Sequence, residues 1–437
     1  MRALIYGAGA REHALAARLS AEGWTVSVAP GNAGIARRLT CTPIDLTDVA
    51  ACVDLARSSK LDLAIVGPEA PLIAGLADAL RASGIVTFGP SQAAARIEGS
   101  KAFSKELMMV VRVPTAAYAV FEGAQGGQLE AAWHFARSLD HRVAIKADGI
   151  AGGKGVVIAT SAAQVEGALQ ALMVQHAFGE ASRRVVIEEL LEGPEVSLMA
   201  LCDGRRAVPL PPVHDYKRVF DDDLGPNTGG MGSVAPTPRV SGPGAAEALC
   251  DLSIRPVIEE LARRGTPFSG LLYAGLMLTS DGPKVLEYNC RFGDPETQSL
   301  LWSLDGRLGE ALFSVARGEL ATLDDRSLRP SGQTAVCVVV AAQGYPEAPR
   351  SGDRIDGLEA AEELCDAVYC AGVAGAGSRG RGLVTSGGRV LSLVGVAAEL
   401  PTARERAYAG LQSLRFEGLQ VRKDIGSDVP RDIGFAP

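Results

Sequence analysis

Short aliphatic segments alternate with alanine-rich segments over the first hundred residues, and this alternation limits the fold more than any other feature of the sequence. Aliphatic runs of this length predict strands, and alanine-rich runs with helical spacing predict helices. The expected strands are residues 2–6, 25–29 and 61–66, and the expected helices are residues 12–20 and 73–82. Strands that alternate with helices form a parallel sheet covered by those helices. We therefore expect an α/β domain at the N-terminus.

The pattern changes near Lys101, where we expect a second domain to start. Residues 143–147 and 156–159 are aliphatic and enclose a glycine-rich loop, which predicts two antiparallel strands joined by a flexible turn. Residues 271–278 and 284–289 are separated by TSDGP, which predicts a β-hairpin. The middle of the chain should therefore be antiparallel.

Residues 209–245 are too rich in proline and glycine for regular structure and too long for a passive connection. A segment of this kind is typical of a functional loop. Strand patterns resume at residues 336–340 and 389–396. These patterns predict a smaller C-terminal unit.

The charge balance argues against a nucleic-acid or membrane-surface binder. The chain has 43 Lys and Arg against 51 Asp and Glu, a net charge of −8, so an anion must be held locally. No uncharged apolar run reaches the roughly 18 residues that cross a bilayer. The N-terminus shows no signal-peptide pattern, and the 8 cysteines have no CxxC spacing. We expect a cytoplasmic monomer with reduced thiols.

A tight glycine turn follows the first expected strand. Gly7 and Gly9 would let an anion approach the free N–H groups of the next helix. The third glycine of the dinucleotide fingerprint is replaced by Glu12, and no acid follows the second strand to hold a ribose. A nicotinamide site is therefore disfavoured, and simple helix–strand packing is the other alternative. The loops at residues 31–34 and 67–72 should lie at the same sheet edge and form a small-molecule site.

Two lysines flank the glycine-rich turn in VAIKADGIAGGKGVVIA. Lys146 ends a strand and Lys154 lies in the turn, so cations and backbone N–H groups could surround phosphates. No Ser or Thr follows Lys154 and a strand comes next, so this is not a Walker A loop. It matches a flap that closes over a nucleotide, with an ordinary hairpin and solvated lysines as the alternative.

An acidic segment follows the next expected strand. Residues 188–191 could offer apolar walls and backbone groups to an adenine, and Glu195 a carboxylate to ribose hydroxyls. For Glu188 considered alone, an exposed acidic side chain is the simpler expectation.

The strand in KVLEYNCRFGDPETQ carries the strongest signal. Side chains alternate along a strand, so Glu287, Asn289 and Arg291 should share one face. The other face should carry Leu286, Tyr288 and Cys290. Neighbouring carboxylate and amide oxygens suit Mg²⁺, which completes its shell with phosphate and water, and the arginine fork suits a carboxylate or phosphate. A structural ion pair is the alternative. In the following GDPE, Asp294 and Glu296 could hold an ammonium or order the loop.

The long loop carries Asp215, Lys217 and Arg218, followed by a glycine turn at residues 227–232. Backbone donors in such a turn can bind an anion. The alternative is a mobile surface loop.

Taken together, these motifs resemble, nearly end to end, those of the glycinamide ribonucleotide synthetase family of the ATP-grasp superfamily. The matching segments include GAREHAL, APGNAG, VGPEAPL, FGPSQAAARIEGSKAFSK, KADGIAGGKGVV, GPNTGGMGS, LLYAGLM, LEYNCRFGDPE and SGGRVL. The resemblance implies a Rossmann-like pre-ATP-grasp domain at residues 1–102 and an ATP-grasp domain at 103–325, with a flap subdomain at about 118–191. A smaller α+β domain is implied at 326–437.

The resemblance also assigns roles to individual residues. Those implied to bind ATP are Lys105, Lys146, Gly152, Gly153, Lys154, Gly155, Glu188, Glu189, Leu191 and Glu195. The implied ligands of Mg²⁺ or Mn²⁺ are Glu287 and Asn289. The implied catalytic residues are Arg291, Asp294 and Lys217. Substrate contacts are implied for Gly9, Arg11, Glu12, Asn32, Pro68, Glu69, Asp215, Asn227, Gly229, Gly230, Met231, Arg291 and Asp294.

The implied reaction joins glycine to 5-phosphoribosylamine at the expense of ATP, through a glycyl phosphate, in de novo purine synthesis. Three alternatives stay open: another ATP-grasp carboxylate–amine ligase, an NAD-dependent dehydrogenase, and a nucleotide-binding regulator without turnover. At three positions the chain departs from the family pattern: His214 stands in place of glutamine, and Tyr216 and Cys370 stand in place of histidine.

Overall fold

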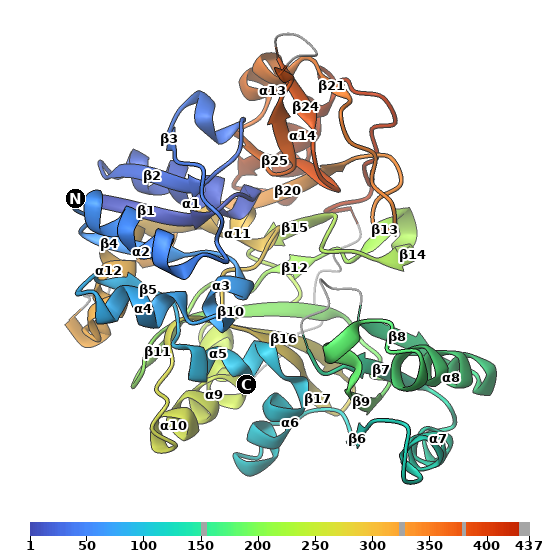
Figure 1. Ribbon diagram of the computed structural model, residues 1–437. Coiled ribbons are helices and arrows are strands. Elements are labelled where there is room, and N and C mark those ends of the chain that lie inside the picture. Colours follow the sequence, from blue (N-terminus) through green and yellow to red (C-terminus); the bar gives the residue numbers. More distant parts are fainter. Residues whose placement is uncertain (150–154, 323–327, 378–381, 428–437) are drawn as a thin grey trace.

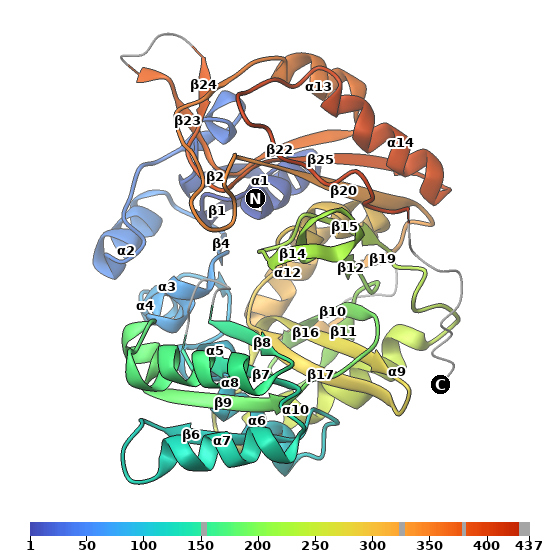
Figure 2. The same cartoon turned by 90° about the vertical axis from the view of Figure 1, so that its right-hand side faces the viewer.

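A computed structural model describes residues 1–149, 155–322, 328–377 and 382–427. Figures 1 and 2 show a central antiparallel sheet with the C-terminal domain at one end and a smaller antiparallel sheet at the other. In the described parts of the chain, no helix combines the length and the apolar character needed to cross a bilayer. All 8 cysteines are free thiols, as the sequence predicts.

The N-terminal domain is a parallel five-stranded sheet in the order β3-β2-β1-β4-β5, which confirms the predicted architecture. The expected helix at 73–82 is in fact two helices, because Gly75 adopts a left-handed conformation (φ 89°) that ends one and starts the next. The strands are β1 (Arg2–Gly7), β2 (Thr25–Pro30), β3 (Thr40–Cys41), β4 (Leu63–Val66) and β5 (Thr87–Phe88). The helices are α1 (Ala10–Ala21), α2 (Val49–Ser58), α3 (Glu69–Ile73) and α4 (Leu76–Ala82).

The smaller antiparallel sheet, in the order β6-β9-β7-β8, has its own hydrophobic core beneath two helices. β7 pairs antiparallel with β8, so the predicted pair around the glycine-rich loop is confirmed. Its elements are β6 (Tyr118–Glu122), β7 (Val143–Ala147), β8 (Val156–Ala159), β9 (Arg184–Glu189), α7 (Gln128–Ser138) and α8 (Ala162–Leu169). The helices that lead into it are α5 (Gln92–Gly99) and α6 (Lys101–Val110).

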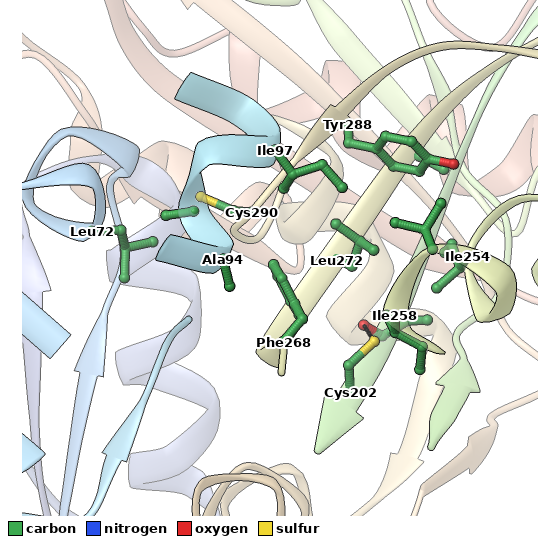
Figure 3. Packing of buried hydrophobic residues seen from close by; sticks show 14 of the residues in the cluster. Leu72, Ala94, Ile97, Cys202, Ile254, Ile258, Phe268, Leu272, Tyr288 and Cys290 are labelled. Atoms are coloured by element: carbon green, nitrogen blue, oxygen red, sulfur yellow. Dashed lines mark hydrogen bonds between the residues drawn. The ribbon is translucent and has the colours of Figure 1, made fainter. Parts of the chain in front are cut away.

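The central sheet has the order β11-β10-β16-β17. One face packs on α10 and α5 around Leu272, Ile258 and Ile97, while Leu72 of α3 extends this core into the N-terminal domain (Figure 3). On the opposite face, Met199, Leu201 and Leu271 pack in a second core with residues 308–315, and Tyr273 and Met277 line a cavity. The elements are β10 (Glu195–Asp203), β11 (Ala207–Pro209), β16 (Ser269–Thr279), β17 (Gly282–Asn289), α9 (Ala245–Ser253), α10 (Arg255–Arg263), α11 (Glu296–Leu300) and α12 (Leu308–Arg317).

The C-terminal sheet, in the order β12-β15-β20-β25-β22, includes strands from residues 209–245, so the expectation of a segment without regular structure is wrong. β15 pairs with β20 about a hundred residues later, and this non-local pairing overrides the local proline and glycine content. The elements are β12 (His214–Asp215), β13 (Arg218–Phe220), β14 (Leu224–Asn227), β15 (Gly232–Ala235), β20 (Thr334–Ala341), β22 (Ala367–Cys370), β25 (Arg389–Ala397), α13 (Leu358–Leu364) and α14 (Leu400–Leu411). Short strand pairs complete the fold: β18 (Leu304–Gly306), β19 (Leu328–Pro330), β21 (Arg354–Ile355), β23 (Val373–Gly375) and β24 (Leu383–Thr385).

Candidate active site

A cavity of about 660 Å³ lies where the N-terminal domain, the two antiparallel sheets and the C-terminal domain meet. It gathers most of the residues singled out in the sequence. The predicted site residues that line it are Gly9, Arg11, Glu12, Pro68, Glu69, Lys105, Lys146, Gly155, Glu188, Glu189, Leu191, Glu195, Asp215, Lys217, Asn227, Gly229, Glu287, Asn289, Arg291 and Asp294.

Three predicted substrate residues do not line this cavity. The Asn32 amide donates to the backbone oxygens of Ala8 and Cys370 at 2.7 and 2.9 Å, so it joins the N-terminal and C-terminal domains. Met231 is fully buried in a core cluster, and Gly230 packs against Asp215, leaving no room for a Cβ. Substrate contacts of these three stay predictions, and Gly152, Gly153 and Lys154 lie outside the described residues.

The Glu188 carboxylate is clamped between two lysines. Its two oxygens lie 2.8 Å from the ammonium groups of Lys105 and Lys146, and its side chain is only 2% exposed. The expectation of an exposed acid is wrong, because β9 is the inner strand between β6 and β7. Burial opposes ionisation of Glu188, but the two ammonium groups lower its pKa below the ordinary value.

Burial also lowers the pKa of Lys105 to about 8, against the opposing effect of Glu188. The Lys105 ammonium donates to the Thr115 hydroxyl at 2.6 Å. Two ammonium groups that could bind phosphate oxygens thus lie at one end of the cavity.

Beside this clamp the cavity has an apolar wall made by Leu191, Met277 and Leu286, which cluster with Ala116. Leu286 was expected on the face opposite to Glu287, and this is wrong. A β-bulge opposite Gly275 and Leu276 leaves Leu286 unpaired, so it joins the cavity face and the alternation restarts after it. The wall has the composition that a planar base requires.

Beyond the bulge, alternation holds. Glu287 lies opposite Gly275 and Asn289 opposite Tyr273, and both line the cavity, whereas Tyr288 packs in the core. Although burial opposes it, the charges of Lys217, Lys146 and Lys101 lower the pKa of Glu287, which keeps the carboxylate ionised. Within the described residues, no cluster of three or more His, Cys, Asp or Glu side chains could hold a metal by itself.

The Arg291 guanidinium bridges the central sheet and the N-terminal domain. It lies 3.2 Å from the Glu69 carboxylate and 3.3 Å from that of Glu98, and it donates to Asn289 Oδ1 at 3.3 Å. Glu98 is nearly buried and also accepts from the backbone N–H of Cys290. The expected anion fork is therefore held in place by two carboxylates.

The glycine turn of the N-terminal domain is filled by the chain's own acid. Glu12 Oε2 accepts from the Gly9 N–H at 2.8 Å, and a Cβ at Gly7 or Gly67 would collide with this side chain. Arg11 lies 2.6 Å from the other Glu12 oxygen. A carboxylate therefore occupies the position that a dinucleotide pyrophosphate takes at such a helix start.

On the opposite wall, Lys217 lies 3.0 Å from the Glu195 carboxylate. Burial acts to lower the pKa of Lys217, but Glu195 and the other acidic groups nearby hold it well above its ordinary value. Asp215 is buried, and within the described structure its Oδ1 has no hydrogen-bond partner. Burial and the neighbouring Glu296 raise the pKa of Asp215 well above the usual range. This oxygen is available to a ligand.

Several lining residues were not singled out in the sequence: Glu98, Lys101, Tyr273 and Arg389. Glu98, Lys101 and Arg389 lie inside the family-like segments FGPSQAAARIEGSKAFSK and SGGRVL, which is the signal that could have found them. Tyr273 belongs to LLYAGLM.

The three departures from the family pattern lie close to the site. His214 Nδ1 is 3.1 Å from the Glu195 backbone oxygen. The Tyr216 hydroxyl accepts from the Gly426 N–H at 2.9 Å, and the Cys370 N–H donates to His13 Nδ1 at 2.9 Å.

Comparison with known proteins agrees with this geometry. Residues 1–98, 99–297 and 335–428 match the N, ATP-grasp (A) and C domains of phosphoribosylglycinamide synthetase. The phosphoribosylamine–glycine ligase of Streptomyces coelicolor is 46% identical, with 98% of this chain and 99% of that protein covered. The corresponding ligase of Caulobacter vibrioides is 45% identical, with 97% of each covered.

Solved structures extend the comparison to the fold. The phosphoribosylamine–glycine ligase of Thermotoga maritima superposes with a TM-score of 0.82 at 34% identity, covering 97% of this chain and 100% of that one. A biotin carboxylase from Campylobacter jejuni gives a TM-score of 0.68 at 14% identity, covering 96% and 92%, and so shares the fold. The chain therefore belongs to the phosphoribosylglycinamide synthetase family and is a ligase built on the ATP-grasp fold.

Proposed function

We propose that this chain joins glycine to 5-phosphoribosylamine with cleavage of ATP to ADP and phosphate, giving glycinamide ribonucleotide in de novo purine synthesis. The observation that carries the proposal is one cavity that combines a lysine clamp, an apolar wall and the Glu287–Asn289 pair. The full-length similarity of this chain to phosphoribosylamine–glycine ligases supports the choice of substrates.

The residues present fit a nucleotide and a divalent cation. Lys105 and Lys146 would hold ATP phosphates, the wall around Leu191 and Met277 the adenine, and Glu195 the ribose. Gly155 and Glu189 border the same space. Glu287 and Asn289 would hold Mg²⁺ or Mn²⁺, leaving phosphate and water to complete the shell. When bound, the cation neutralises phosphate charge and aligns the transferred group.

The proposed chemistry activates the glycine carboxylate as an acyl phosphate, because oxide is too poor a leaving group for direct attack by an amine. Phosphoryl transfer asks the protein for alignment and positive charge, and not for a covalent nucleophile. Lys217 stands next to Glu195 in the cavity, where it would neutralise the developing charge. The flap over the cavity would exclude water from the acyl phosphate.

The substrates are proposed to lie on opposite sides of Arg291. Phosphoribosylamine would meet the loops that carry Arg11, Pro68 and Glu69. Glycine would lie towards Asp294 and the orphan oxygen of Asp215, which suits an ammonium group. The turn around Asn227 and Gly229 would close this side.

An ADP-release assay with each substrate omitted in turn tests the proposal. We expect ADP only when ATP, Mg²⁺, glycine and phosphoribosylamine are all present, with glycinamide ribonucleotide as product. ADP release that needs another carboxylate or amine would identify a different ATP-grasp ligase. NADH binding without ATP binding would favour a dehydrogenase, and ATP binding without turnover would favour a regulator.

We further propose domain boundaries near residues 102 and 325, a monomeric state and a cytoplasmic location. The matched domain families support the boundaries, since they meet at residues 98–99 and leave 298–334 as a connection. Sedimentation of the purified chain tests the monomer.

A further inference from the structure

One arginine of the C-terminal tail is buried as completely as any core residue. Arg422 is 1% exposed and is the largest fully buried side chain of the described structure. Its guanidinium binds both oxygens of Asp424 at 2.8 and 2.6 Å and one oxygen of Asp223 at 2.7 Å. It also donates to the Arg218 backbone oxygen at 3.1 Å. The tail is thereby tied to the hairpin of β13 and β14.

The same guanidinium lies over a side chain next to the site. Its carbon is 5.0 Å from the centre of the Tyr216 ring, which is itself 1% exposed. The Tyr216 hydroxyl accepts from the Gly426 N–H at 2.9 Å. We call residues 214–218 the strap. Tyr216 lies in it between Asp215 and Lys217, whose side chains both line the cavity. The tail therefore contacts the strap at the residue between its two cavity-lining side chains.

Further contacts fasten the hairpin to the tail. The Asp222 N–H donates to Asp424 Oδ2 at 2.9 Å, and the Lys423 N–H donates to Asp221 Oδ1 at 2.7 Å. Figures 1 and 2 show β14 between the C-terminal domain and the smaller antiparallel sheet that carries β8. The tail therefore holds the hairpin from the C-terminal domain, whereas Lys146 and Glu188 of the clamp belong to β7 and β9 of the smaller sheet.

We propose that Arg422 is a positioning residue for the ligase reaction, which fixes the strap so that Asp215 and Lys217 meet the substrates. This inference rests on the function proposed above. The strap pairs with β15 at two residues, and its backbone makes further hydrogen bonds at Tyr216 and Lys217. What the tail adds is a restraint on the Tyr216 side chain, between the two residues that line the cavity. Asp215 and Lys217 are ionisable groups in a buried setting, where a displacement of about 1 Å can cost on the order of 100-fold in rate.

Arg422→Met tests the proposal, with Arg406→Ala as the matched control. Met keeps the aliphatic volume but removes the fork. Arg406 belongs to the same domain and holds Asp366 at 2.8 Å, without a hydrogen bond to the tail or strap. We expect kcat/KM for glycine to fall on the order of 100-fold in Arg422→Met. ATP affinity should fall much less, because the lysine clamp does not touch the strap, although Lys217 contacts the proposed ribose ligand Glu195. Arg422→Lys should be intermediate, and free guanidinium should restore part of the activity of Arg422→Ala.

Hydrogen exchange supplies a readout that is independent of turnover. The Tyr216 N–H donates to Gly232 O and the Met231 N–H to Tyr216 O, so both report on the strap. We expect both amides to exchange at least about tenfold faster in Arg422→Met and to be unchanged in Arg406→Ala. Unchanged exchange, or a loss of glycine and ATP binding in equal measure, would overturn the proposal. If the wild-type chain forms no glycinamide ribonucleotide, the proposed function fails, while exchange still decides whether Arg422 holds the strap.

Discussion

The Arg389 guanidinium of β25 lies 3.5 Å from the Asp294 carboxylate, and it also donates to the Asp294 backbone oxygen at 2.6 Å. The two residues come from different domains. Arg389 further donates to the Gly229 oxygen, so the glycine turn and the GDPE loop share one cation. Burial opposes ionisation of Asp294, but Arg389 and Arg11 hold its pKa below the usual range. The C-terminal domain is thus part of the site.

Replacing Arg389 by alanine should cost activity without unfolding the chain. The loss of one partner of a nearly buried pair costs about 3 kcal/mol in the free energy of unfolding. Displacement of Asp294 and of the glycine turn should lower kcat/KM on the order of 100-fold. Without the guanidinium the pKa of Asp294 rises, so the acidic limb of the pH–rate profile should move to higher pH. A pH series of kcat/KM measures both effects. In the Arg389→Ala variant, adding Asp294→Asn should lower kcat/KM little further. Losses in kcat/KM that add fully would contradict the coupling of Arg389 to Asp294.

Glu287→Ala should leave a folded chain with little ligase activity. Of the two proposed ligands the cation would lose the charged one, and Asn289 offers only a neutral oxygen. Activity should also disappear with a chelator and return with Mg²⁺ or Mn²⁺. Titrating Mg²⁺ against turnover makes the comparison, with the surface variant Glu310→Ala as control. Near-normal turnover in Glu287→Ala would reject the metal assignment.

Local periodicity predicted the elements that carry the site. β7 and β8 have the predicted ranges, and Glu287 and Asn289 share the cavity face, because alternation on a strand needs only neighbouring residues. Buried parallel strands such as β1 and β4 gave equally clear aliphatic runs.

Features that depend on distant partners were not readable. β15 forms because β20 supplies its hydrogen bonds, and Arg389 enters the site from another domain. Leu286 turns to the cavity through a bulge that no residue pattern marks. The burial of Glu188 follows from the pairing of β9 with β6 and β7, and its two lysine partners lie 83 and 42 positions away, a contact that no local pattern indicates.

Glu188→Gln should weaken ATP binding and lower stability. Two buried ammonium groups would share a neutral amide, at a cost of about 3 kcal/mol in the free energy of unfolding. The pKa of Lys105, already lowered to about 8 by burial, should fall further when the carboxylate charge is lost. The alkaline limb of the pH–rate profile should therefore move to lower pH.

Calorimetric titration with a non-hydrolysable ATP analogue, together with thermal melting, checks these effects. Glu192→Gln is the matched control, because that carboxylate is 77% exposed. Equal ATP affinity and equal alkaline limbs in the wild type and Glu188→Gln would exclude a clamp function.

His13 should make the chain sensitive to acid at the contact between its N-terminal and C-terminal domains. Burial, helped by Arg38 and Arg37, lowers its pKa from 6.5 to about 4, and its neutral Nδ1 accepts from the Cys370 N–H. The unfolded chain thus takes up the proton at higher pH than the folded one. The stabilisation, about 3 kcal/mol, is present above pH 6.5 and is lost as the pH falls from 6.5 towards 4.

Urea unfolding between pH 7.5 and 4 measures this loss. His13→Asn keeps an acceptor but does not titrate, so the variant should lose less stability over this range than the wild type. His134→Asn is the control, because His134 is 63% exposed and should leave the pH dependence unchanged. If the free energy of unfolding of His13→Asn falls with pH as steeply as that of the wild type, groups other than His13 take up the protons, and the prediction is wrong.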